Sequence, residues 1–316
     1  MTLDTSVRGS YRPRRKRSGD PPPLQLTDRD IDMLRIIARH RFLNSGHVRR
    51  LIPGSEKNIT TRLKTLFEHA YLDRPQCQYD FYRPGGGSAL IVYALADKGA
   101  ALLRDRDGGA ASASGSWAHK NRKAGRPFLE HTLAIADFAV ALTAEVAASP
   151  DLDVTDGASL VARLPASTRD ADKHYRLSVP VIFRSTSQTI SVEPDYAFSL
   201  GSPADGWRRN FLVEIDRGTM PVERSDLTQT SILRKFLAYR AIWQAKLHTS
   251  AFGWRNFRVL FVTSSAERVE TMRDVLSRMT GGGSPLFWFA DRDALNARNS
   301  LDHVWIDGQG SERRIR

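Results

Sequence analysis

Residues 211–219 read FLVEIDRGT, and this stretch decides the fold of the longer half of the chain. Its first residues are strong strand formers, which indicates a buried β-strand. Glu214 and Asp216 are two positions apart, so on a strand both carboxylates leave the same face of the sheet, while Val213 and Ile215 point to the other. The pattern therefore predicts one acidic face and one core face.

A second acidic position lies shortly before this strand. Residues 189–200 (TISVEPDYAFSL) are also rich in strand formers, and the GSPADGW that follows is dense in turn formers, so the two runs are expected to form a hairpin. A suitable register would place Asp195 beside Glu214, because neighbouring strands lie about 4.8 Å apart. The two carboxylates could then share Mg²⁺ or Mn²⁺, which take hard oxygen ligands and can activate a phosphodiester. The alternative is that the acids pair with flanking arginines.

Composition bounds the class of protein. The chain has 316 residues and 41% apolar content, which is enough for two globular domains. Charged residues interrupt every apolar run well before twenty residues, so we expect neither a membrane span nor a signal peptide. The single cysteine, Cys77, excludes an intrachain disulfide and a cysteine-based zinc cluster. These features favour a cytoplasmic protein.

Positive charge is concentrated near the N-terminus. The formal net charge is +12, and the first 100 residues contain 18 Lys and Arg against 10 Asp and Glu. Residues 1–23 combine a basic run with a proline block and have no apolar periodicity, which predicts a disordered basic arm. The arm is expected to lie on phosphates or to remain free.

Residues 24–104 have the pattern of a winged helix. Thr27 is a candidate N-cap for a first helix with Asp30 in its first turn, a second helix is expected over 45–51, and a third over about 56–69. The strand-like runs QYDFYRP and ALIVYAL then flank a GGG turn, and the helical ADKGAALLRD follows. In winged-helix proteins the third helix enters the major groove of DNA. The alternative is a winged helix that contacts proteins.

A Gly, Ala and Ser-rich linker is expected over 105–124, followed by a second domain over 125–316. This domain begins with a well-patterned helix from PFLEHTL. Further strands are expected at HYRLSVPVIF, FRVLFVT and LFWFA, with helices over about 225–247 and 266–279. The fold class is therefore α/β (α+β).

Two resemblances rest on these motifs. The order of a helix, three mostly antiparallel strands, a helix and another strand is similar to the core of the PD-(D/E)xK nuclease superfamily, with Pro194-Asp195 and Glu214-x-Asp216 on its second and third strands. Over roughly residues 24–290 the chain resembles the bacterial replication-relaxation family, which is associated with plasmids and other mobile elements. The most specific part of that resemblance is EIDRGT. It implies a winged helix-turn-helix followed by a restriction-endonuclease-like mixed sheet flanked by helices.

The nuclease resemblance implies that Asp195 and Glu214 are metal ligands and that Glu130 on the leading helix supplies a third carboxylate. The chain departs from the pattern at Asp216, where active members usually carry a lysine that stabilises charge developing on phosphate. Lys235 on the following helix is the candidate replacement. It lies about 60° from the centre of an apolar stripe, so it could border the sheet. The alternative is a solvated or snorkelling lysine. The stripe consists of Ile232, Phe236, Tyr239 and Trp243.

These patterns and resemblances together predict a DNA-binding protein of a plasmid or other mobile element that acts in DNA replication or processing. Its enzymatic form would be an Mg²⁺- or Mn²⁺-dependent endonuclease with Asp195, Glu214, Asp216 and Lys235 as catalytic residues. The alternative is a non-catalytic transcription regulator or replication accessory factor without a cofactor, which Asp216 favours. The expected partners are double-stranded DNA and a second copy of the chain. The expected DNA contacts are Arg14, Arg15, Lys16, Arg17, Lys57, Asn58, Thr61, Arg62, Lys64 and Arg83.

The tryptophans do not indicate a nucleic-acid site in the sequence. Six are present, and Trp207, Trp243, Trp254 and Trp288 are expected in the core or at its edge. None is interleaved with arginines densely enough along the sequence to indicate a stacking groove for nucleic acid.

Overall fold

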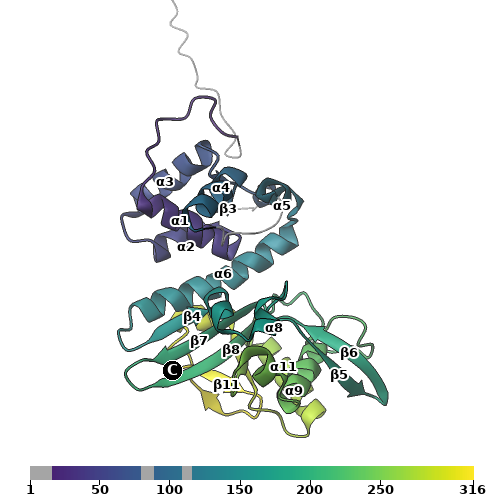
Figure 1. The fold of residues 1–316 in the computed structure, drawn as a ribbon. Coiled ribbons are helices and arrows are strands. Elements are labelled where there is room, and N and C mark those ends of the chain that lie inside the picture. Colours follow the sequence, from purple (N-terminus) through teal and green to yellow (C-terminus); the bar gives the residue numbers. More distant parts are fainter. Residues whose placement is uncertain (1–15, 80–88, 109–115) are drawn as a thin grey trace, which may run out of the picture. The chain divides into compact units, whose positions relative to one another are not determined.

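The computed structural model describes residues 16–79, 89–108 and 116–316 (Figure 1). It comprises two compact units, Met1–Ala136 and Asp137–Arg316. Helices combine with parallel and antiparallel strands, which confirms the α/β class. Among the residues so described, no helix combines the length and the apolar character needed to cross a bilayer.

Three helices open the first unit, at the positions that the sequence predicts. They are α1 (Asp28–His40), α2 (Ser45–Leu51) and α3 (Glu56–Glu68). Each begins at a polar N-cap whose side chain accepts a backbone N–H of the first turn: Thr27, Asn44 and Ser55. Thr27 and Asp30 form a reciprocal capping box, which explains why α1 begins where it does.

A small antiparallel sheet joins these helices, in the strand order β1 (Leu43–Asn44), β3 (Val92–Leu95), β2 (Leu72–Asp73). The expected first strand QYDFYRP is wrong in its described part, because Gln76–Gln78 form a 3₁₀ turn and β3 pairs with Leu72–Asp73 instead. Residues 80–88 lie outside the described residues.

Helix α4 (Asp97–Arg106) follows β3, and a further short helix, α5 (Trp117–Lys123), occupies part of the segment expected as a linker. Asp97 accepts the backbone N–H of Trp117 at 2.6 Å, and buried Asn121 donates to the carbonyl of Leu95 at 2.9 Å. These bonds hold α5 to the first unit.

The second unit contains a seven-stranded mixed sheet in the order β12-β11-β10-β9-β8-β7-β4 (Figure 1). Strand β7 is antiparallel to its neighbours β4 and β8, strands β8, β9 and β10 are parallel to one another, and β11 is antiparallel to both β10 and β12. The strands are β4 (Asp153–Asp156), β7 (Tyr196–Ser202), β8 (Trp207–Ile215), β9 (Arg258–Thr263), β10 (Phe287–Asp291), β11 (Trp305–Asp307) and β12 (Glu312–Arg313).

Helices cover both faces of this sheet. On one face α9 (Ile232–Gln244) and α11 (Ala266–Thr280) pack against a core that includes Leu212 and Phe261. On the other face Phe198 stacks on Phe211, and Phe138 of α6 (Arg126–Ala147) packs against Phe198. The prediction of one acidic and one core face is therefore incomplete, because the face that carries the acids is also buried.

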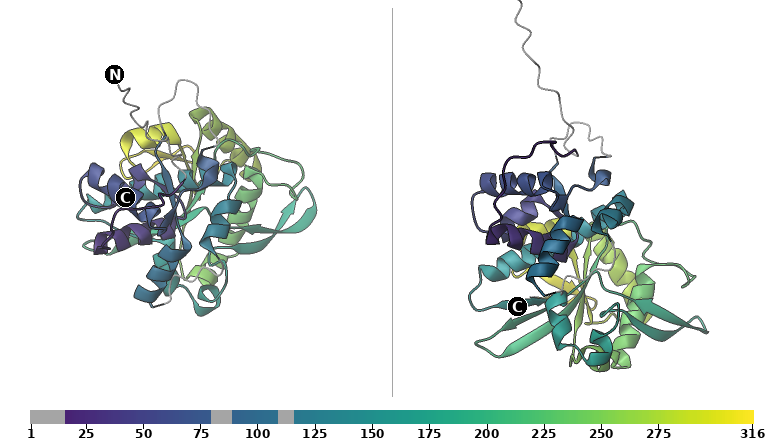
Figure 2. Two further views of the ribbon diagram at one scale, coloured as in Figure 1. Left: turned by 90° about the horizontal axis from the view of Figure 1, so that it is seen from above. Right: turned by 45° about the horizontal axis from the view of Figure 1, so that its top comes forward.

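Two strands stand apart from the main sheet. β5 (Leu177–Phe183) and β6 (Thr186–Val192) form their own antiparallel pair, which packs on α9 (Figures 1 and 2). The expected single strand over 189–200 is thus wrong, since the chain leaves β6 at Val192 and enters β7 at Tyr196. Pro194 lies in this break, where its missing N–H cannot interrupt a ladder.

The helix expected over 225–247 begins later, at Ile232, where Ser231 caps α9. Its buried stripe continues from Tyr239 to Ile242, so Trp243 is 44% exposed rather than buried. The remaining short helical elements are α7 (Gly157–Leu160), η2 (Val161–Arg163), α8 (Ala166–Arg169), α10 (Leu247–Phe252) and α12 (Arg292–Arg298).

Candidate functional site

Asp195 immediately precedes β7 and Glu214 lies on the neighbouring strand β8, and the register between the two strands is the one that places these residues side by side. Tyr196 pairs with Val213, so Asp195 falls opposite Glu214 one step further along. The backbone N–H of Asp195 donates to the carbonyl of Val213 at 3.0 Å, and the Asp195 carboxylate accepts the N–H of Ile215 at 2.8 Å. The second bond holds the Asp195 side chain at the end of β8.

Two side chains of α9 bind the Glu214 carboxylate. Lys235 forms an ion pair with Oε2, and the Tyr239 hydroxyl donates to Oε1 at 2.5 Å. Lys235 and Tyr239 are four residues apart, so both lie on the face of α9 that meets the sheet. The structure thus brings Asp195, Glu214 and Lys235 together, and it adds Tyr239, which the apolar stripe of the sequence indicates only as a core residue.

Burial controls the protonation of this cluster. It raises the pKa of Glu214, which is 1% exposed, to about 7; Lys235 opposes that rise and Asp195 adds to it. For Lys235, burial works against the ammonium, but the carboxylates of Glu214 and Asp195 outweigh it and raise its pKa. Lys235 is therefore a cation at neutral pH.

Asp216 has different partners. Its carboxylate forms an ion pair with Arg268 of α11, with one contact at 3.0 Å, and accepts the Thr263 hydroxyl at 2.5 Å. Arg268 also donates to the carbonyl of Met220 at 2.5 Å. The structure therefore joins Asp216 to the α11 helix and not directly to the other predicted catalytic residues.

The donors available to a cation can be compared with what Mg²⁺ requires. Mg²⁺ is usually held by one or two carboxylates and several waters, which the Asp195 and Glu214 pair could supply. Because both oxygens of Glu214 already hold α9, a cation there would compete with Lys235. Glu130, the expected third ligand, lies on α6 in the first unit and pairs with Arg126 at 2.8 Å. Within residues 16–79, 89–108 and 116–316, no group of three His, Cys, Asp or Glu is placed to hold a metal.

The predicted recognition face lies on α3. Ile59, Leu63 and Leu66 are buried against the first unit, and the opposite face of the helix is exposed. The exposed predicted contacts are Lys57, Asn58, Thr61 and Lys64.

Arg62 does not share this free face. Its guanidinium pairs with Asp30, which is 0% exposed, and donates to the carbonyl of Gln25 at 2.9 Å. Burial alone would raise the pKa of Asp30, but Arg62 and Thr27 hold it below its usual value. Arg62 therefore ties α3 to α1.

Part of the expected free arm is bound to the first unit. Arg17 donates to the carbonyls of Phe67 and Leu72 at 2.8 and 2.9 Å and pairs with Asp73 at 2.8 Å. Lys16 is exposed. Arg14, Arg15 and Arg83 lie outside the described residues.

Comparison with known proteins gives one family. A family model described as Replication-relaxation matches residues 34–255, a range that includes α3, Asp195, Glu214 and Lys235. No curated protein and no solved structure gives a significant match.

Proposed function

The chain belongs to the replication-relaxation family, whose model covers more than half of it, and we propose that it binds duplex DNA in the replication or processing of a plasmid or other mobile element. The observation that carries this proposal is the exposed face of α3. The exposed polar side chains of α3 are spaced so that they lie on one face of the helix. The opposite face is buried in the core, so a rigid helix holds the side chains that would contact DNA.

The chemistry of the α3 face suits a DNA groove. Lys57 and Lys64 supply cations for phosphates, which give affinity without sequence preference. Asn58 and Thr61 supply amide and hydroxyl groups that can bond to base edges in the major groove. The three helices and the β1-β3-β2 sheet have the element order of a winged helix, in which the third helix enters that groove.

The test is fluorescence anisotropy with labelled duplex DNA over a range of salt concentrations. Loss of two phosphate contacts in Lys57→Ala/Lys64→Ala should reduce the slope of log K against log salt by about 1.8. Arg104→Ala is the matched control, because Arg104 is an exposed cation on α4 of the same unit. Equal affinity and slope in the double variant and the wild type would refute the proposed interface.

A second activity, metal-dependent phosphodiester hydrolysis, is favoured by the meeting of Asp195, Glu214 and Lys235. When α7, α8 and the separate β5-β6 pair are left aside, the order α6, β4, β7, β8, α9, β9 is similar to that of the PD-(D/E)xK core, and Lys235 lies on the helix after the third of these strands. Bound Mg²⁺ or Mn²⁺ would activate a water and polarise the phosphate. Asp195 and Glu214 would hold the cation, and Lys235, whose side chain is 24% exposed, would stabilise negative charge on the phosphate.

The alternative is a non-catalytic regulator or accessory factor in which the same contacts only hold α9 to the sheet. The saturation of both Glu214 oxygens by Lys235 and Tyr239 favours it. Nicking of supercoiled plasmid with Mn²⁺ or Mg²⁺ separates the two. Nicking that disappears in Asp195→Asn and Glu214→Gln, with duplex binding retained, would support hydrolysis. Binding without nicking would favour the regulator.

A further inference from the structure

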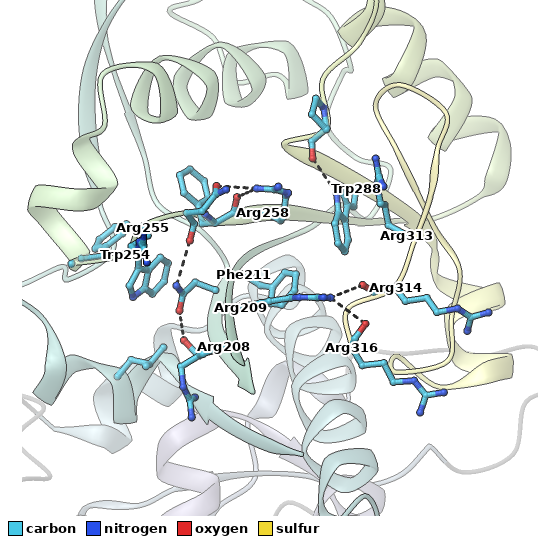
Figure 3. Close-up of a pocket in the computed structure, with 18 of the residues that line it drawn as sticks. Arg208, Arg209, Phe211, Trp254, Arg255, Arg258, Trp288, Arg313, Arg314 and Arg316 are labelled. Carbon is cyan, nitrogen blue, oxygen red and sulfur yellow. Dashed lines mark hydrogen bonds between the residues drawn. The ribbon is translucent and has the colours of Figure 1, made fainter. Parts of the chain in front are cut away.

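A cavity of about 970 Å³ lies in the second unit, at the end of the sheet where β8 and β9 begin (Figure 3). The start of β8, the segment 253–258 that leads into β9, and the chain around β12 contribute its walls. Glu214 lies at the other end of β8. It is five positions along the strand from Arg209, which corresponds to about 17 Å at the rise of a strand. The cavity is therefore distinct from the acidic cluster.

Arginine dominates this cavity. Its lining includes eight arginines and a single acidic residue, Glu312. The eight are Arg163, Arg208, Arg209, Arg255, Arg258, Arg313, Arg314 and Arg316. They come from four separate parts of the chain, which is why the sequence does not show that they lie together.

Acidic partners neutralise only some of these arginines. Arg208 pairs with Asp153, Arg313 with Asp307 and Arg316 with Asp302. Arg258 instead donates to a neutral oxygen, that of the Asn256 amide, at 2.9 Å, and Arg209 donates to the main-chain oxygens of Arg314 and Arg316 at 3.4 and 3.1 Å. Arg163 and Arg255 are exposed and form no ion pair within the part of the chain that the structure describes.

The arginines of the cavity also act on one another. Burial lowers the pKa of Arg258, and the neighbouring Arg313 and Arg209 lower it further. Repulsion among guanidinium groups of this kind is relieved when an anion binds between them. The cavity is thus electrostatically prepared for a multiply charged anion.

Aromatic side chains form the apolar part of the wall. Phe211, Trp254 and Trp288 line the cavity, and Trp288 is fixed by a bond from its indole N–H to the carbonyl of Pro285 at 3.1 Å. Arginines beside aromatic rings are the combination that binds single-stranded nucleic acid, in which phosphates and base faces are both accessible. In a duplex the base faces are stacked and cannot reach such a wall.

We propose that this cavity binds single-stranded DNA, with phosphates on the arginines and a base against Trp254 and Trp288. Trp254 and Trp288 are each 7% exposed, as expected for residues at the edge of the core, and the arginines that folding brings to them are distant in the sequence. The recognised unit is a phosphorylated nucleotide, which also occurs free in solution. This site is separate from the proposed α3 interface, which lies in the other unit.

The test uses the full chain, fluorescein-labelled dT20 and EDTA, with anisotropy as the readout. Arg163→Gln/Arg255→Gln removes two exposed, unpaired cations, so the fold should persist. We expect affinity to fall about tenfold or more and the salt slope to fall by about 1.4, the value for two contacts to a single strand. Arg184→Gln, an exposed cation at the turn between β5 and β6, is the matched control and should bind normally.

The two interfaces give opposite patterns. Arg163→Gln/Arg255→Gln should retain duplex binding, while Lys57→Ala/Lys64→Ala should retain dT20 binding. The tryptophan fluorescence of the wild type should also be quenched by dT20. Unchanged dT20 affinity in the arginine double variant, or an equal loss in Arg184→Gln, would overturn the proposal. Displacement of dT20 by dTTP at the same nucleotide concentration would overturn it in favour of a free-nucleotide site.

Discussion

Lys235 and Glu214 form an ion pair across the boundary between α9 and β8, in which the carboxylate is 1% exposed and the lysine side chain 24% exposed. Glu214 is thus buried, while Lys235 is partly exposed to solvent. This asymmetry means that loss of the lysine leaves a buried carboxylate without its counter-ion.

Lys235→Met should therefore destabilise the protein by about 3 kcal/mol at pH 8, where Glu214 is ionised. The loss should be smaller at pH 5, because burial raises the pKa of Glu214 to about 7 and the neutral acid needs no cation. Urea denaturation at both pH values measures this difference. The double variant Lys235→Met/Glu214→Gln should recover much of the stability at pH 8. An equal loss of stability in Lys235→Met at pH 5 and pH 8 would contradict a role for Lys235 as the counter-ion of ionised Glu214.

The raised pKa of Glu214 also predicts how stability depends on pH. Between the usual value near 4.5 and about 7, the folded protein holds a proton on Glu214 that the unfolded chain has released. Stability must therefore fall as pH rises through this window, by up to about 1.4 kcal/mol per unit. In EDTA, Glu214→Gln should remove this component from the profile of urea midpoint against pH. If the urea midpoints of the wild type and Glu214→Gln changed with pH in parallel, the pKa of Glu214 would not be raised.

Local signals explain what the sequence could predict. The Thr27 cap with Asp30, the apolar stripe of α3 and the strand pattern around Glu214 all depend on residues within a few positions of one another. The pairing of the two strands that carry Asp195 and Glu214 to the same end of the sheet likewise follows from two adjacent strand-like runs and a short turn, whereas their exact register comes from the structure. Such features are encoded by periodicity and capping, and they were predictable.

Contacts between residues that are far apart in the sequence are not predictable in this way. Asp30 binds Arg62, and Asp216 binds Arg268, across 32 and 52 residues respectively. These pairs depend on how helices pack, and any of several nearby cations would have fitted the sequence equally well. For the same reason the sequence indicates only a core position for Tyr239, because its bond to Glu214 depends on how α9 packs on the sheet.

Substitution of Arg62 shows whether this residue stabilises the fold through Asp30 or contacts DNA. Arg62→Ala should destabilise the first unit by about 3 kcal/mol, because it leaves buried Asp30 unpaired. Thermal unfolding measures this loss, and Asp30→Asn/Arg62→Ala should be less destabilised than Arg62→Ala. Under conditions where the single variant is fully folded, its duplex affinity should stay within about twofold of the wild type. A large loss of affinity in a folded variant would instead make Arg62 a DNA contact.

Asp216 offers the corresponding test in the second unit. Its carboxylate binds Arg268 and the Thr263 hydroxyl, so Asp216→Asn should cost about 2 kcal/mol of stability, as expected when a buried charged hydrogen bond is lost. Arg268→Ala should cost at least as much, and the double variant should lose less than the sum, because both substitutions break one pair. Urea denaturation of the three variants gives this coupling. If the wild type nicks plasmid, a folded Asp216→Asn should keep most of that activity, whereas Asp195→Asn should lose it. Loss of nicking in Asp216→Asn at unchanged stability would show that Asp216 takes part in the chemistry and that its contact with Arg268 is secondary.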